Sequence, residues 1–146
     1  MIGFLLDTNV ISEAVRANPD ARVSSWMDSV EEDLMYLSVL TLGEIRQGIA
    51  SLAHGKRRLR LERWLDVELR TRFDGRIVGI NEEIAERWGS LTAEARRAGT
   101  SLGVVDGLLA ATALEHGLTL ATRNVKDFVR LGVALSNPWS EGGSGR

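Results

Sequence analysis

The chain has 146 residues, of which 44% are hydrophobic and 26% are charged. This balance is typical of one domain with a sizeable core, and it excludes a disordered or fibrous chain. The absence of cysteine excludes disulfides, thiolate chemistry and cysteine-based metal sites. No apolar run reaches the roughly 18 residues of a membrane helix, and no signal peptide is recognisable. We therefore expect a cytoplasmic protein without membrane association.

The net charge is −2, so no global basic field draws the protein to nucleic acid. The positive charge is unusual in kind, because sixteen arginines stand beside only two lysines. The planar arginine fork suits phosphate recognition, but arginine is also common in proteins from GC-rich genomes, and both explanations stay open. His54 and His116 lie at predicted helix ends without a second histidine at metal-ligand spacing, so we assign them structural roles.

Taken in chain order, the apolar and polar patterns predict short strands that alternate with helices. The predicted elements are a strand over 3–6, a helix over 10–15, a helix from Pro19 to 30, a strand over 35–37, a helix over 42–53 capped by Thr41, a long charged helix over 56–72, a strand over 77–80, a helix capped by Asn81 and ending at 98, a helix over 105–115 that stops at Gly117, a strand over 118–121, a short helix after the turn 122–124, and an edge strand over 133–135. This alternation predicts an α/β fold with a mainly parallel sheet covered on both faces. In such sheets, ligands bind beyond the carboxyl ends of the strands.

Three acidic residues stand alone beside apolar segments. Asp7 directly follows the first predicted strand, Glu44 lies soon after the second, and Asp106 sits between two apolar runs. Burying an isolated carboxylate costs on the order of several kcal/mol unless another group compensates its charge. Mg²⁺ and Mn²⁺ prefer carboxylate oxygens and water as ligands. The three acids therefore favour a small metal-dependent enzyme that acts on phosphates.

Each of these acids also has a purely structural explanation. Asp7 could cap the helix that follows it, and the segment from Thr41 to Glu44 matches a capping box. Asp106 lies at the start of a helix, where the helix dipole favours an anion. Considered alone, capping explains Asp7 as well as a functional role does, and it explains Glu44 better. The apolar neighbours of Asp106 favour a functional role there.

A further polar cluster follows the strand over 118–121. Thr122 and Asn124 either form an ordinary turn or contact a phosphate or a metal-bound water, with Asp127 in a supporting role. Arg123, between them, either holds a phosphate or pairs with a surface acid. The turn lies at the carboxyl end of its strand, so it can reach the same rim of the sheet as Asp7.

Together, four segments resemble the PIN-domain ribonucleases of the VapC toxin family. These segments are 5–13 (LLDTNVISE), 37–45 (LSVLTLGEI), 106–113 (DGLLAATA) and 120–128 (LATRNVKDF). They keep the order and spacing of the family over nearly the whole chain. The Asn-Pro-Trp sequence at 137–139 is similar to the FitB-like branch in particular.

The resemblance implies a three-layer α/β/α sandwich formed by a single PIN domain over 1–139. The Gly- and Ser-rich sequence that follows separately predicts a flexible tail over 140–146. It implies an endoribonuclease, dependent on Mg²⁺ or Mn²⁺, that cleaves RNA with a metal-activated water. The implied catalytic and metal-binding residues are Asp7, Glu44 and Asp106. The implied supporting or substrate-contacting residues are Thr8, Asn9, Thr122, Asn124 and Asp127. The family's fourth, more variable acidic position falls at or near the turn over 122–124, where the chain has Asn124, with Asp127 three residues on. The fourth ligand and a second metal ion therefore stay open.

The resemblance also implies the toxin of a type II toxin–antitoxin system, with RNA as substrate and a homodimer as the assembly. Its cognate antitoxin would be of the VapB or FitA type, and DNA would be bound only through that antitoxin. An antitoxin segment needs an apolar groove, which we predict between the helices over 42–53 and 56–72. The predicted lining residues are Ile45, Ile49, Leu52, Leu59 and Trp64.

Two other function classes remain as alternatives. A haloacid-dehalogenase-like phosphatase also begins with an aspartate after a buried strand, but it needs a second aspartate two residues later, where this chain has Asn9. The other alternative is a non-catalytic α/β interaction module whose carboxylates only cap helices. A metal titration separates these classes, because caps alone would give no specific Mg²⁺ or Mn²⁺ site.

Overall fold

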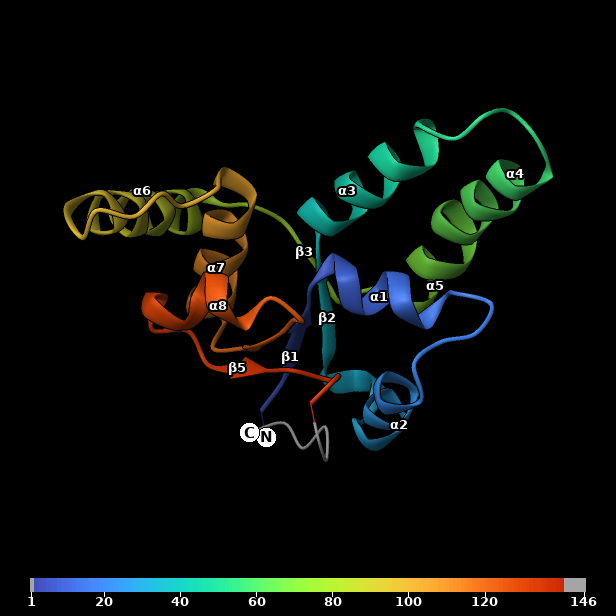
Figure 1. Cartoon of the computed structure of the whole chain (residues 1–146), viewed down its shortest axis with the longest axis horizontal. Helices are drawn as coiled ribbons and strands as arrows, with labels where there is room; N and C mark the ends of the chain where they lie inside the picture. Colours follow the sequence, from blue (N-terminus) through green and yellow to red (C-terminus); the bar gives the residue numbers. More distant parts are fainter. Residues whose placement is uncertain (1, 141–146) are drawn as a thin grey trace.

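A sheet of five parallel strands runs through the centre of the computed structural model, which describes residues 2–140 (Figure 1). The strand order is β3-β2-β1-β4-β5, and every neighbouring pair is parallel. The strands are β1 (Phe4–Leu6), β2 (Met35–Ser38), β3 (Ile77–Val78), β4 (Thr119–Ala121) and β5 (Leu135–Ser136). The predicted α/β class with a parallel sheet is therefore confirmed, and β5 forms the predicted edge strand, although it begins two residues later than expected.

Helices cover both faces of this sheet, because successive side chains of a strand point to opposite sides. Leu6 packs into one core with α1 (Thr8–Ala14), α2 (Ala21–Ser29) and α3 (Val39–Ala50). Leu5 packs into a second core with α6 (Glu82–Arg97), α7 (Val104–His116) and α8 (Val125–Phe128). Figure 1 shows the first group of helices to the right of the sheet and the second group to the left. The predicted three-layer α/β/α sandwich is confirmed.

The long charged helix predicted over 56–72 is continuous but not uniform. It begins as α4 (Lys56–Arg63), widens into the π-helical segment η2 (Trp64–Leu69), and ends as α5 (Arg70–Arg72). Short 3-10 turns, η1 (Glu32–Leu34) and η3 (Val129–Leu131), precede β2 and follow α8. The predicted stop at Gly117 is confirmed, since this residue has a φ of 63° and caps α7 in the left-handed conformation.

Two of the predicted helix starts are wrong. Pro19 was expected in the first turn of its helix, but Asp20 is the cap and α2 begins at Ala21. Thr41 was expected to cap the next helix, but the chain passes from β2 directly into α3, and the Ser38 hydroxyl accepts a hydrogen bond from the Leu40 N–H at 3.0 Å. Because no loop separates β2 from α3, the sequence has no turn residues that mark where this helix begins.

None of the helices in residues 2–140 is long and apolar enough to cross a lipid bilayer.

The flexible tail predicted over 140–146 lies outside the described residues, apart from Ser140. The boundary at residue 139 therefore stays a prediction.

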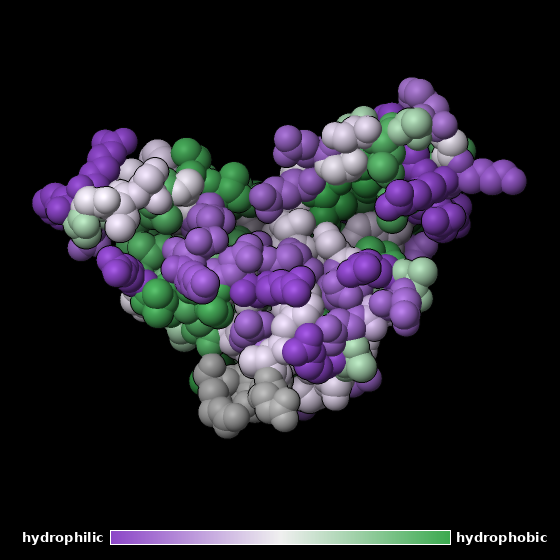
Figure 2. All heavy atoms as spheres, in the orientation of Figure 1, coloured by the Kyte–Doolittle hydropathy of each residue, from purple (hydrophilic) through white to green (hydrophobic). Residues whose placement is uncertain are grey.

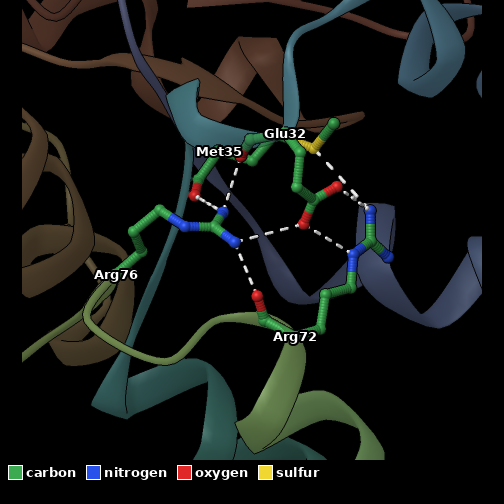
Figure 3. Close-up of polar contacts among 4 residues, drawn as sticks. All are labelled: Glu32, Met35, Arg72 and Arg76. Carbon is green, nitrogen blue, oxygen red and sulfur yellow. Dashed lines mark hydrogen bonds and ion pairs between the residues drawn. The ribbon is translucent and has the colours of Figure 1, made fainter.

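A cluster of Glu32, Met35, Arg72 and Arg76 fixes one edge of the sheet (Figure 3). The Arg76 guanidinium donates to the main-chain carbonyls of Glu32 (2.6 Å), Met35 (2.7 Å) and Arg72. The Glu32 carboxylate accepts two hydrogen bonds from Arg72, of 2.9 and 3.0 Å, and one from Arg76, of 3.3 Å, and these bonds lower the pKa of that carboxyl. The cluster thus joins η1, β2 and α5 just before β3 begins.

Replacement of Arg76 by alanine should destabilise the protein by about 1–3 kcal/mol, because three main-chain carbonyls lose this donor and that of Met35 is partly buried. Replacement of Arg72 by alanine is the matched control, since both guanidinium groups lie about equally far from the Phe73 ring, at 5.0 and 5.1 Å. It should cost about 0–1 kcal/mol, because the Arg72 guanidinium donates to no main-chain carbonyl of the described residues and its strongest contact is an exposed ion pair with Glu32. Urea unfolding of both variants measures the difference, and equal values would show that the carbonyl bonds are unimportant.

Candidate active site

The predicted site residues meet at the point where the strand order reverses. The chain builds β2 and β3 on one side of β1, and β4 and β5 on the other. Asp7 follows β1 and Thr122 follows the adjacent β4, and the Asp7 N–H donates to the Ala121 carbonyl at 2.9 Å. This is the position at which open parallel sheets bind ligands.

Asp7 is the buried centre of the cluster, with 7% of its surface exposed. One carboxylate oxygen, Oδ1, accepts from the Thr8 N–H at 2.7 Å. The other, Oδ2, accepts from the Thr122 hydroxyl at 2.8 Å and from the Asn9 side-chain amide at 3.3 Å. Asp7 therefore caps α1, as one explanation held, and it also joins the ends of two strands. A helix-capping role alone would not require Asp7 to be buried or to accept a hydrogen bond from Thr122.

Glu44 lies beside Asp7, because the Thr8 hydroxyl donates to its Oε1 atom. Since Ser38 caps α3, Glu44 is in the second turn of that helix rather than at the third position of a capping box. The expectation that it starts a helix is therefore wrong, and the structural explanation for this acid is removed. Thr41 is instead buried inside α3, where its hydroxyl has no hydrogen-bond partner among the described residues.

Asp106 reaches the same cluster from the opposite helical layer. It is in the first turn of α7, whose cap is Gly103, and it is half-buried. Within residues 2–140, no side chain or main-chain N–H donates a hydrogen bond to its carboxylate, in contrast to Asp7 and Glu44. Asp106 therefore carries a partly desolvated charge that only the helix dipole favours.

The turn after β4 supplies the supporting residues, to different degrees. Thr122 is fully buried, and its hydroxyl bridges the Asp7 carboxylate and the Asn124 N–H, which donates to it at 3.0 Å. Asp127 lies on α8, close enough for its charge to act on Asp106. The Asn124 side chain makes no hydrogen bond within the described chain, so only its main chain joins the cluster.

The acids of the cluster act on one another electrostatically. Burial is the main reason that the pKa of Asp7 is raised, and the charge of Glu44 raises it further. Burial also raises the pKa of Asp106, helped by the charges of Asp7, Asp127 and Glu44. No Lys, Arg or His nitrogen of the described residues forms an ion pair with any of these acids. The rim thus concentrates negative charge without an internal counter-charge.

This donor set has the chemistry of a hard-cation site, because clustered carboxylates are relieved by a divalent ion. Among residues 2–140, however, no three Asp, Glu, His or Cys side chains stand close enough together to hold one ion. The acids are therefore neighbours that side-chain rotation would have to draw together. Their assignment as metal ligands stays a prediction.

The geometry speaks against the phosphatase alternative. That chemistry needs an acid at the position of Asn9, but the Asn9 side chain is bound as an amide. Its nitrogen donates to Asp7 and, at 3.5 Å, to Thr122, while its oxygen accepts from the Arg123 N–H at 3.2 Å. Asn9 thus positions the cluster and has no proton to transfer.

A groove of about 940 Å³ opens beside the cluster, between α1, α3 and α4. Figure 2 shows apolar surface between α3 and α4 under a hydrophilic rim. Its lining includes Ile45, Ile49, Leu52 and Trp64, as predicted. Leu59 was predicted to line it but is 65% exposed and absent from the lining, which includes Leu61 instead.

Sequence reasoning missed Leu61 and Trp139 as groove residues. Leu61 stands three residues before Trp64 and four before the buried Leu65, which is helical spacing, whereas Leu59 does not share this face. Periodicity could therefore have found Leu61. Trp139 comes from the far end of the chain, and no local pattern indicates its place beside α1.

The position of Asp106 depends on its neighbour Gly107, where α7 packs against α6. A Cβ atom at Gly107 would lie 2.8 Å from Trp88 Cδ1 and 3.1 Å from Trp88 Nε1. Gly107→Ala should therefore destabilise the protein by about 1–3 kcal/mol through overpacking, and it should displace the start of α7. Because a shift of about 1 Å in a site can lower a rate by ~10²-fold, activity should fall as well.

Gly89→Ala, on α6, is the matched control for Gly107→Ala. A Cβ atom there meets nothing within 4 Å, so this variant should be stabilised by about 0.5–1 kcal/mol. Thermal unfolding and activity of both variants test the contact. Wild-type stability in Gly107→Ala would show that Trp88 does not hold α7 in place.

Comparisons with known proteins agree with this geometry. The family model "PIN domain" matches residues 4–133. Toxin FitB from Neisseria gonorrhoeae is 40% identical over 137 residues, which cover 94% of this chain and 99% of the relative. VapC ribonuclease Y4jK from Sinorhizobium fredii is 38% identical over 135 residues, covering 92% and 96%. The structure of FitAB bound to the IR36 DNA fragment matches with a TM-score of 0.89 and 38% identity, covering 94% of this chain and 96% of that one. The chain therefore belongs to the PIN-domain family, in the branch that includes the toxin FitB and VapC ribonucleases.

Proposed function

We propose that this protein is a divalent-metal-dependent endoribonuclease and the toxin of a type II toxin–antitoxin system. The observation that carries the proposal is the rim of Asp7, Glu44, Asp106 and Asp127, whose charges act on one another without an internal counter-charge. The names of the relatives, a toxin and a VapC ribonuclease, support the assignment to RNA. An interaction module that used these acids only as caps would have no reason to gather them.

The proposed roles follow from the contacts of each residue. Asp7, Glu44 and Asp106 would hold the ion, with Asp127 or Asn124 beside them. Thr122 and Asn9 fix the Asp7 carboxylate, and the Thr8 hydroxyl orients Glu44. PIN-domain ribonucleases generally use divalent metals, and we propose Mg²⁺, with Mn²⁺ as a substitute. When bound, such an ion neutralises charge on the phosphate and lowers the pKa of water, so no side-chain nucleophile is required.

The most direct test of the proposed function is the sequencing of RNA ends after the protein is induced in cells. Wild-type protein should produce new internal RNA ends, and Asp7→Asn should not. Identical patterns of ends in the two cultures would overturn the proposal. The sequence around the new ends would also identify the RNA that is cut.

Metal should stabilise the wild-type protein against heat. If the dissociation constant is about 1 mM, then about 10 mM Mg²⁺ stabilises the fold by roughly 1.4 kcal/mol. This raises the melting temperature by a few degrees in a domain of this size. Differential scanning fluorimetry with and without metal measures the shift. An equal shift in an Asp7→Asn, Asp106→Asn double variant would place the ion elsewhere.

Without metal, Asp106→Asn should melt at a higher temperature than the wild type. The raised pKa of Asp106 means that its ionised form disfavours folding at neutral pH, and the carboxylate accepts no hydrogen bond that the amide would lose. Asp7→Asn should gain less or nothing, because the Asp7 carboxylate accepts three hydrogen bonds. With metal, this advantage of Asp106→Asn should disappear.

We propose that an antitoxin of the VapB or FitA type binds the groove between α1, α3 and α4. Its apolar wall suits a segment that must gain enough burial to offset its ordering, and the acidic rim beside it could accept an arginine or lysine. The FitAB structure was determined with a DNA fragment. Because this chain has a net charge of −2, we assign DNA binding to the antitoxin. We also propose the homodimer as its assembly.

A further inference from the structure

Arg123 is held at the edge of the acidic rim through both its main chain and its side chain. Its N–H donates to the Asn9 side-chain oxygen at 3.2 Å, and the residue before it, Thr122, binds Asp7. The guanidinium carbon lies 5.1 Å from the centre of the Trp139 ring. Trp139 is itself buried, with 6% of its surface exposed, so the ring is a fixed support. Both the main chain and the side chain of Arg123 are therefore fixed in place.

The simplest structural explanation for this arginine is an ion pair with a surface acid. Within residues 2–140, no carboxylate oxygen lies within 4.0 Å of its guanidinium nitrogens. The charge of Arg123 does act on Asp20, but only weakly. Hydrogen bonds from Arg22, at 2.9 and 3.1 Å, are the main reason that the pKa of Asp20 falls to about 2. Asp20 is thus already paired with another arginine.

A guanidinium that stacks on a ring keeps the N–H donors at its edge directed outward. Arg123 is exposed and lines the groove together with Thr8, Asn9 and Glu44, so its side chain borders the space beside the acids. A rim of carboxylates repels a nucleic-acid backbone, and the net charge of −2 offers no general attraction. A single positioned arginine there supplies local attraction for a phosphate, which its fork can bind through two hydrogen bonds.

We propose that Arg123, stacked on Trp139, binds a backbone phosphate of the RNA strand next to the phosphate that is cleaved. Trp139 acts as a positioning residue, because it orients the guanidinium and does not itself contact the RNA. This inference rests on the proposed ribonuclease function, since it names a binding site for the same substrate. It gives Trp139, near the C-terminal limit of the described residues, an indirect role in substrate binding.

The test measures binding of a fluorescein-labelled single-stranded RNA of random sequence to the full chain by fluorescence anisotropy, with Ca²⁺ in place of Mg²⁺ and RNA integrity checked on gels. Arg123→Ala should weaken binding about 10-fold or more, as expected for loss of charge-assisted hydrogen bonds. It should also lower the slope of log K against log salt by about 0.7, the value for one phosphate contact on a single strand. Arg123→Lys should lie between, because it keeps the charge but loses the fork.

Arg130→Ala is the matched control, since Arg130 is an exposed arginine outside the lining of the groove. It should bind RNA like the wild type. Equal affinity and equal salt slope in Arg123→Ala and Arg130→Ala would overturn the inference while leaving the nuclease function intact. Absence of RNA binding by the wild type would overturn it too. Wild-type binding that depends on Arg123, without any cleavage in Mg²⁺, would retain the phosphate site and reject the nuclease.

The role of Trp139 is tested by a double-mutant cycle. Trp139→Leu keeps apolar bulk but removes the ring face, whereas Trp139→Phe keeps a ring. Trp139→Leu should weaken RNA binding, and its effect should largely vanish in the Arg123→Ala background. In cleavage assays, Trp139→Leu and Arg123→Ala should each raise KM more than they lower kcat. Additive effects of the two substitutions would show that Trp139 supports only the fold.

Discussion

Replacing Asp7 or Asp106 by the isosteric asparagine should lower the rate of RNA cleavage by more than about 100-fold. Removal of a residue that only supports a metal ligand lowers activity by up to about 100-fold. Removal of a ligand itself should lower it further. Glu44→Gln should have the same effect, because the amide oxygen can still accept from Thr8 while the charge is lost. The measurement is the initial rate of cleavage of a labelled RNA at saturating Mg²⁺, together with growth inhibition in cells.

Asp28→Asn is the control for this series, because Asp28 is an exposed acid on α2 with no contact to the rim. It should cleave RNA at the wild-type rate. Circular dichroism and thermal melts of each variant separate loss of chemistry from loss of fold. Full activity in Asp106→Asn would remove Asp106 from the site, and with it the link between the two helical layers.

Trp64→Ala should weaken binding of the antitoxin by about 30-fold or more, the effect of losing an aromatic hot spot in a desolvated groove. Arg60, on the rim of the same groove, should matter less. Its replacement by glutamate should change the affinity by no more than about 5-fold, because exposed ion pairs contribute little. A titration with the purified product of the neighbouring gene measures both, and equal affinity of Trp64→Ala and wild type would place the antitoxin elsewhere.

Trp64 also packs against the core, so a second variant keeps this prediction testable if Trp64→Ala unfolds. Gly48 lines the groove, and a Cβ atom there meets nothing within 4 Å. Gly48→Phe should therefore fold normally and obstruct the groove. Leu59→Ala is the control, since Leu59 is 65% exposed and lies outside the groove. Normal antitoxin binding by Gly48→Phe would contradict a segment in this groove.

The elements that the sequence predicted well are those whose pattern is local. The helix capped by Asn81 has its cap bond to the Ile84 N–H at 2.9 Å, and α7 ends at Gly117 as expected. The start of α3 was misplaced, because a strand that passes into a helix at Ser38 has no turn signal, whereas Thr41 imitates one. The π-helical segment has no signature within the charged sequence from Lys56 to Arg72.

The candidate site, like the helices and strands, was predictable where its pattern is local. Isolated acids after apolar segments indicated Asp7 and Asp106, and strand alternation indicated that they share a rim. Hydrogen bonds between distant segments were beyond such reasoning, since the contact between Thr122 and Asp7 spans 115 positions. The sequence also could not show that Thr8 orients Glu44, because this contact depends on the rotamers of two side chains from different helices.

The place of β1 in the centre of the sheet has a consequence for synthesis of the protein. β1 is made before the other four strands, but one of its two neighbours, β4 at Thr119–Ala121, is made only after α7. Until then Asp7 lacks Thr122, and the acids of α7 and α8 have no sheet edge on which to meet it. We therefore expect a chain that ends before β4 to lack the proposed nuclease activity. With the proposed nuclease function, we therefore expect the RNA of the translating ribosome to be safe from a chain on which β4 has not yet emerged.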